Sequence, residues 1–87
     1  MDEKRKIIER GRRASTITSL DSVVMEALKD LEDRYTNEWK DSKVEESVKR
    51  ESAFMAVKVL DDLKTQLQTY AERGRFAEKQ LQKETLQ

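Results

Sequence analysis

The stretch that decides the fold runs from residue 53 to residue 81 and reads AFMAVKVLDDLKTQLQTYAERGRFAEKQL. Small or apolar residues recur in it at alternating steps of three and four, which is the heptad spacing of packed helices. They are Ala53, Ala56, Leu60, Leu63, Leu67, Tyr70, Gly74, Ala77 and Leu81. This heptad seam predicts a helix over residues 44–83, about 60 Å long, that packs on a partner helix.

A shorter helix is predicted before it, over residues 21–40. Asp21 is a suitable N-cap for this helix, and Leu20 can pack on Met25 as a hydrophobic staple. Apolar residues one turn apart then form a single stripe, the predicted hairpin core: Val24, Leu28, Leu31, Tyr35 and Trp39. Since Tyr35 and Trp39 continue this stripe, core packing is favoured for them over a role as anchors for a partner protein.

The connection between the two helices is short and polar, covering Asp41 to Lys43. Ser42 can cap the second helix, with Glu45 completing a capping box. Because short connections join antiparallel neighbours, the predicted fold class is all-α: an antiparallel helical hairpin with a long second helix. Residues 21–87 would form this hairpin domain.

The two predicted helices differ in length, and this difference predicts self-association. A helix of about 20 residues covers only about 30 Å, so roughly half of the seam on the second helix stays bare. Apolar surface of that extent favours assembly into a helical bundle or coiled coil with further copies. The predicted self-association seam consists of Leu60, Leu63, Leu67, Tyr70, Gly74, Ala77 and Leu81. In the alternative, the helix ends at Gly74 and the chain folds back on itself.

Composition argues against several classes of function. The 87 residues contain no histidine, cysteine or proline and only two glycines, and 41% of them are charged. Histidine as a base or metal ligand and cysteine as a nucleophile are therefore missing, and no Gly-rich phosphate loop accompanies the carboxylates. We expect no catalytic site, cofactor or metal. No segment has the roughly 20 apolar residues of a membrane span, so we expect a cytosolic protein without membrane contacts.

Charge is unevenly distributed along the chain. Residues 1–13 carry a net charge of +3 and residues 21–51 a net charge of −4. With Gly11 and several hydroxyl residues following the basic run, residues 1–20 are predicted to be a basic, partly disordered arm and linker. The candidate phosphate contacts in this arm are Lys4, Arg5, Lys6, Arg10, Arg12 and Arg13. Any binding of nucleic acid through them should be weak and sensitive to salt.

Phe54 and Met55 lie beside the seam rather than in it. Two adjacent apolar residues at that place are the candidates for a second contact surface. A wider intramolecular core would account for the pair equally well.

Beyond these patterns, the chain resembles a group of small helical proteins encoded by tailed bacteriophages and prophages, often near virion structural genes. The resemblance spans Glu9 to Leu81. It rests on Glu9-Arg10-Gly11 with Ala14, on Val24, Glu26-Ala27, Leu31, Tyr35 and Trp39, on Arg50-Glu51, Leu60 and Leu67, and on Gly74 with Ala77 and Leu81. Members of the group generally have no assigned function, and the resemblance implies no catalytic or ligand residues. The arm from Lys4 to Arg13 is more basic than the group leads us to expect.

Together these observations predict a non-enzymatic phage structural or morphogenesis accessory that acts through self-association and contacts with other virion proteins. The resemblance places it in the host cytoplasm or in the virion. Two alternatives remain open at this point. One is a nucleic-acid-binding accessory of the DNA-packaging type that uses the basic arm, and the other is a host-directed inhibitor that binds through Phe54 and Met55.

Overall fold

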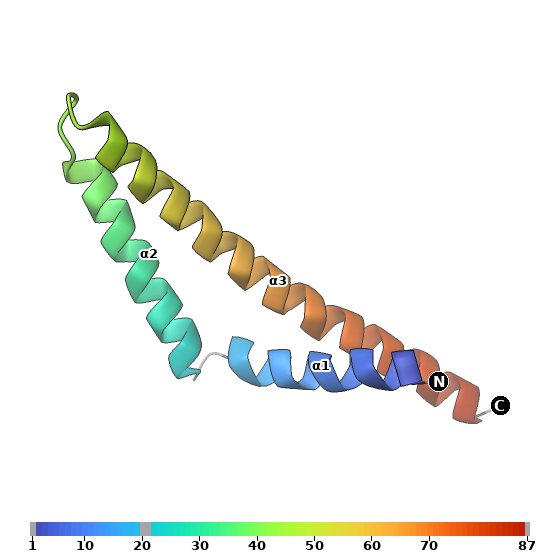
Figure 1. Ribbon diagram of the computed structural model, residues 1–87. Coiled ribbons are helices and arrows are strands. Elements are labelled where there is room, and N and C mark those ends of the chain that lie inside the picture. Colours follow the sequence, from blue (N-terminus) through green and yellow to red (C-terminus); the bar gives the residue numbers. More distant parts are fainter. Residues whose placement is uncertain (1, 20–21, 87) are drawn as a thin grey trace.

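The protein is a three-helix chain in the computed structural model, which describes residues 2–19 and 22–86 (Figure 1). Helix α1 covers Asp2–Thr18, α2 covers Val23–Asp41 and α3 covers Ser47–Leu86. No strand occurs within the described ranges. The predicted all-α hairpin with a long last helix is confirmed, and α3 runs through Gly74 without a break.

Helices α1 and α2 follow one another along α3, and both run antiparallel to it (Figure 1). Near the chain ends, Lys4 Nζ lies 2.9 Å from Glu84 Oε1, and further along, Glu32 Oε1 lies 2.8 Å from Lys64 Nζ. Together α1 and α2 hold 36 residues, close to the 40 of α3. The molecule is therefore a hairpin whose first arm is broken into two helices.

The prediction of a partly disordered N-terminal arm is wrong, because residues 2–18 form α1. Three residues spaced three apart, Ile8, Gly11 and Ala14, lie on one face of this helix and are buried. Two of these three residues have little or no side chain. This buried face is therefore hard to recognise in the sequence among the surrounding charged residues. Helix α1 continues past Gly11 and ends at Thr18, and α2 begins at Val23.

The prediction that half of the seam is bare is also wrong, for the same reason. Helix α1 packs on the C-terminal half of α3, where it buries Ala71, Gly74 and Ala77. Neither a second copy nor a fold-back at Gly74 is needed to cover that half. The difference in helix length was the basis for predicting self-association. Helix α1 removes it, because α1 covers the part of α3 that α2 does not reach.

The start of α2 is set by a serine cap. Ser22 has extended backbone angles, and its side chain accepts a hydrogen bond from the Met25 N–H at 3.4 Å. This satisfies one of the free N–H groups at the helix N-terminus. The predicted cap Asp21 and the predicted staple residue Leu20 lie outside the described residues.

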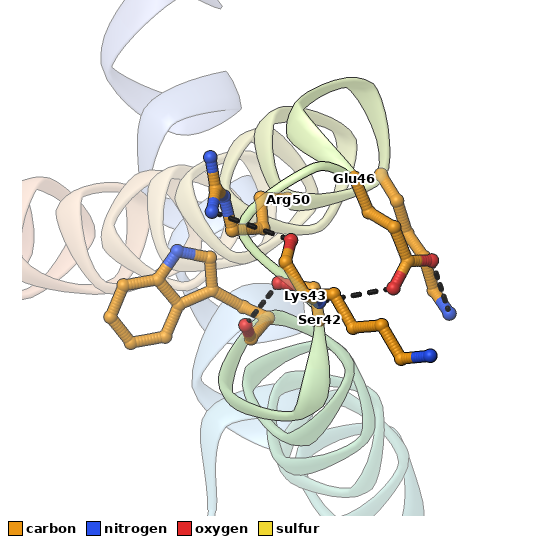
Figure 2. A network of polar contacts seen from close by, with 6 residues as sticks. Ser42, Lys43, Glu46 and Arg50 are labelled. Carbon is orange, nitrogen blue, oxygen red and sulfur yellow. Dashed lines mark hydrogen bonds and ion pairs between the residues drawn. The ribbon is translucent and has the colours of Figure 1, made fainter.

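The turn between α2 and α3 holds a compact polar network, shown in Figure 2. Ser42 closes α2 rather than opening α3, since its hydroxyl donates to the Trp39 carbonyl at 2.6 Å. The Lys43 N–H donates to the Glu46 carboxylate at 3.0 Å, while the Glu46 N–H donates back to the Lys43 carbonyl at 3.0 Å. These two bonds close the turn between Lys43 and Glu46 directly before α3, so the capping box predicted from Ser42 and Glu45 is wrong.

We expect Glu46→Ala to lower the free energy of unfolding by about 0.5–1.5 kcal/mol, because it leaves the Lys43 N–H without its acceptor. Urea denaturation followed by circular dichroism measures the change. Glu45→Ala is the matched control: it removes the exposed neighbouring carboxylate and should change stability by less than about 0.5 kcal/mol. Equal losses from the two variants would contradict this assignment of the cap.

The hydrophobic core is thin. Its buried apolar residues are Ile8, Ala14, Leu28, Ala53, Ala71 and Ala77. The molecule measures 65 × 23 × 15 Å, and its radius of gyration is 18.2 Å, compared with about 12 Å for a compact domain of this length. Its accessible surface is 7109 Å², whereas a globular monomer of this mass exposes about 5,300 Å². The fold therefore leaves far more surface open than a compact domain does.

Candidate protein-interaction surface

Helices α1 and α3 make their closest approach where the two glycines of the chain meet. A Cβ atom on Gly11 would lie 2.6 Å from the Gly74 Cα and 2.8 Å from the Tyr70 carbonyl oxygen. A Cβ atom on Gly74 would lie 2.7 Å from the Gly11 Cα. These distances are shorter than any side chain tolerates, so both positions need glycine for close helix packing.

Charged side chains of α1 also contact α3. Arg12 pairs with Glu78, and Lys4 pairs with Glu84. The guanidinium carbon of Arg10 lies 4.3 Å from the centre of the Tyr70 ring, within the range of a cation–π contact. Each of these contacts joins one helix to the other across the crossing.

The six candidate phosphate contacts therefore do not form a free basic tail. Lys4, Arg10 and Arg12 contact α3, and all three lie on a helix instead of a disordered arm. Arg5, Lys6 and Arg13 are exposed on α1. Acidic side chains from α3 lie beside two of the six cations, which lowers the positive potential that the arm would offer to phosphate.

The residues predicted as a self-association seam lie mainly inside the hairpin. Gly74 and Ala77 are buried, and Leu60, Leu67 and Tyr70 are half-buried. Leu63 and Leu81 are the exceptions, with 46% and 37% of their surface exposed. Most of this seam thus packs on α1 and α2 of the same chain. Only its exposed residues, Leu63 and Leu81, are open to contact with a second copy.

The predicted hairpin core is buried unequally. Leu28 is buried at 6% exposure, and Leu31 and Tyr35 are half-buried between α2 and α3. Val24 and Trp39, at the two ends of the same stripe, are 43% and 46% exposed. The ends of α2 therefore pack less closely than its middle.

A second apolar surface runs along the N-terminal half of α3. It comprises Val48, Met55, Val59 and Leu63, which are 76%, 60%, 61% and 46% exposed, and we name it the α3 stripe. At about 3.6 residues per turn, its members lie within roughly 80° of one another around the helix. Phe54, which is 50% exposed, lies outside it, where its ring is 5.7 Å from Lys58 Nζ.

The sequence analysis names two members of this stripe, each for a different surface. Met55 was a candidate for a second contact surface, and Leu63 was assigned to the seam. Val48 and Val59 were missed because the heptad pattern accounts for the helix without them. Steps of seven, four and four from Val48 to Leu63 form a second helical register, and that signal could have revealed the stripe.

The described residues were compared with the requirements of a metal site, a ligand groove and a membrane span. No group of three or more acidic side chains among them is placed to hold a metal ion. Open grooves of about 720 and 670 Å³ flank the α1–α3 crossing, and charges of both signs line each of them. None of the described helices is long and apolar enough to cross a membrane.

Comparisons of the chain with models of protein families, with curated proteins and with solved structures find no match in any of the three.

Proposed function

We propose that this protein is a non-enzymatic assembly accessory that acts through helix-mediated contacts, with itself and with other proteins of the particle. The observation that carries the proposal is the α3 stripe. Four large apolar side chains lie on one flank of a regular helix, outside the core that α1 and α2 form with α3. Isolated exposed apolar residues are ordinary, whereas several of them on one helix face, here with Ser52 between Val48 and Met55, are typical of a binding surface.

The shape of the molecule supports the same proposal. A thin rod 65 Å long with a core of mostly small residues exposes much surface relative to its mass. Such a rod offers a long contact line, and the two grooves beside its α1–α3 crossing are open. Contact between helices is the interaction that this geometry serves best.

The resemblance to small helical proteins of tailed phages supplies the setting of the proposal. We infer a structural or morphogenesis role, in the host cytoplasm during assembly or within the virion. The helical state of residues 2–18 and their contacts with α3 weigh against the DNA-packaging alternative, because a docked helix offers phosphate fewer free cations than a flexible tail.

The test is recruitment to particles. Virions purified from cells that express the wild-type chain should contain it at a fixed copy number, measured by quantitative mass spectrometry. Met55→Asp should lower that copy number at least about tenfold, since a carboxylate in an apolar contact must be desolvated without a partner. Val23→Asp is the matched control: it places the same charge on an exposed valine of α2 and should be recruited normally. Absence of the wild-type chain from particles and from their assembly intermediates would refute the proposed role.

A further inference from the structure

We propose that α2 is a displaceable cover on the N-terminal half of α3, which opens while α1 stays docked on the C-terminal half. The molecule then has two parts of unequal stability, the α1–α3 half and the α2–α3 half. Three properties support this order of opening: burial, polar contacts between helices, and the way in which α2 is joined to the chain. The opening occurs within a single copy, so it can be tested independently of the proposed function.

The α1–α3 half is buried more completely than the α2–α3 half. At the crossing, three residues of each helix are buried: Ile8, Gly11 and Ala14 on α1, and Ala71, Gly74 and Ala77 on α3. In α2, Leu28 is the only buried residue, and Ala53 is the only one among residues 47–66 of α3. Burial removes apolar area from water and brings atoms into close contact, and both effects stabilise docking. Helix α2 is therefore held less firmly than α1.

Polar contacts between the helices show the same inequality. Helix α1 contacts α3 through two ion pairs and the cation–π contact at Tyr70. Between α2 and α3, the described residues form one ion pair, in which Glu32 lies 2.8 Å from Lys64. Because ion pairs near the surface each contribute little, the difference in burial is the larger effect, and the polar contacts act in the same direction.

Helix α2 is joined to the chain at both ends, to α1 through residues 19–22 and to α3 through residues 42–46 (Figure 1). While α1 stays docked, α2 cannot swing away as a rigid arm. It opens instead by losing helical structure, because most of the stability of a helix of 19 residues comes from its packing. Helix α3, with 40 residues and with α1 still docked on it, keeps its helical form.

The opening of α2 changes the surface that α3 presents. In the closed molecule the α3 stripe is exposed, while α2 shields Ala53 and Leu60 on the neighbouring face. Once α2 opens, the N-terminal half of α3 carries exposed apolar residues on two adjacent faces. Helix α2 therefore controls how much apolar surface this part of α3 offers. Elements that move to uncover a surface are drawn from the least stable parts of a fold.

Hydrogen exchange on the full chain, followed by mass spectrometry of its peptides, measures the order of opening. After correction for intrinsic rates, residues 26–37 of α2 should exchange at least about tenfold faster than residues 8–15 of α1 and 70–78 of α3. These segments avoid the chain ends, which fray in most proteins. Equal protection in the three segments would overturn the proposal, since the fold would then open as one unit. Faster exchange in residues 8–15 than in 26–37 would also overturn it, since α1 would then open first.

Substitution of Ile8 tests whether α2 opens without the release of α1. Ile8→Ala shortens the only large buried side chain of α1, so it should speed exchange in residues 8–15 at least about tenfold. Exchange in residues 26–37 should stay unchanged, because α1 remains docked when α2 opens. Ile8→Val should give the same pattern with a smaller acceleration. Acceleration of residues 26–37 by either variant would overturn the proposal, since opening of α2 would then require release of α1.

Substitution of Leu31 tests whether exchange in α2 reflects its separation from α3. Leu31 is half-buried, and Leu31→Ala should speed exchange in residues 26–37 at least about fivefold. Glu38→Gln is the control, since it changes an exposed side chain of the same helix and should leave that exchange unchanged. If Leu31→Ala has no more effect than Glu38→Gln, exchange in α2 does not involve loss of its contact with α3, and the proposal fails.

Discussion

Replacing Gly74 with alanine should destabilise the protein by about 1–3 kcal/mol, although the same change at an exposed helix position stabilises by about 0.5–1 kcal/mol. The sign is reversed because the new Cβ would lie 2.7 Å from the Gly11 Cα. The Gly11 Cα is a backbone atom and cannot rotate away as a side chain can. Helix α1 must therefore move away from α3. Gly11→Ala should have the same effect, since its Cβ meets the Gly74 Cα at 2.6 Å.

Urea denaturation measures the change in the free energy of unfolding. The distance between spin labels at Lys6 and Lys83 shows whether α1 moves away from α3. Both labelled side chains are exposed, one on α1 and the other on the facing end of α3. The distance should lengthen or broaden in Gly74→Ala. Thr65→Ala, at an exposed position of α3 outside the α3 stripe, is the control and should be neutral or slightly stabilising. A stabilised Gly74→Ala would show that α1 does not dock on α3 as described.

Leu28→Asp should unfold the protein. Leu28 is 6% exposed and is the only buried residue of α2, so a carboxylate there loses its water and leaves the apolar contact with α3 unfilled. The cost of several kcal/mol is comparable with the whole stability of a chain this size, about 4–13 kcal/mol. Leu28→Ala should give a graded loss of about 2–5 kcal/mol without abolishing the fold.

Circular dichroism at 222 nm and thermal unfolding measure both variants. Val23→Asp serves again as the control, because it introduces the same charge at a 73% exposed position in the first turn of α2. An acidic residue there also interacts favourably with the helix dipole, so its stability should match or exceed that of the wild type. Retention of native helicity and melting temperature in Leu28→Asp would contradict the packing of α2 on α3.

The proposed interaction surface, the α3 stripe, is only partly predictable from the sequence. The heptad seam is the strongest pattern in the chain, and it led to a self-association surface that is largely occupied by α1 and α2. The α3 stripe is weaker as a pattern, because Val48, Met55 and Val59 are separated by charged and small residues. Their significance depends on exposure, and exposure is known only once the positions of α1 and α2 are known.

The sequence by itself determined the class of the fold and the two helices with strong apolar stripes. The helix predicted over 21–40 is observed as Val23–Asp41, and the one predicted over 44–83 as Ser47–Leu86. Both predictions succeed for one physical reason. Large apolar residues at helical spacing specify a helix and the face that it buries, whatever the partner turns out to be.

Only the tertiary structure decided that residues 2–18 form a docked helix and that the seam is closed within the chain. The face of α1 that meets α3 depends on Gly11 and Ala14, residues that bury little area and carry no strong signal of burial. Their contribution to packing depends on the crossing with Gly74. There the two glycines have no side chains, so the backbones of α1 and α3 can approach closely. Such complementarity belongs to a pair of surfaces far apart in sequence, so neither segment reveals it alone.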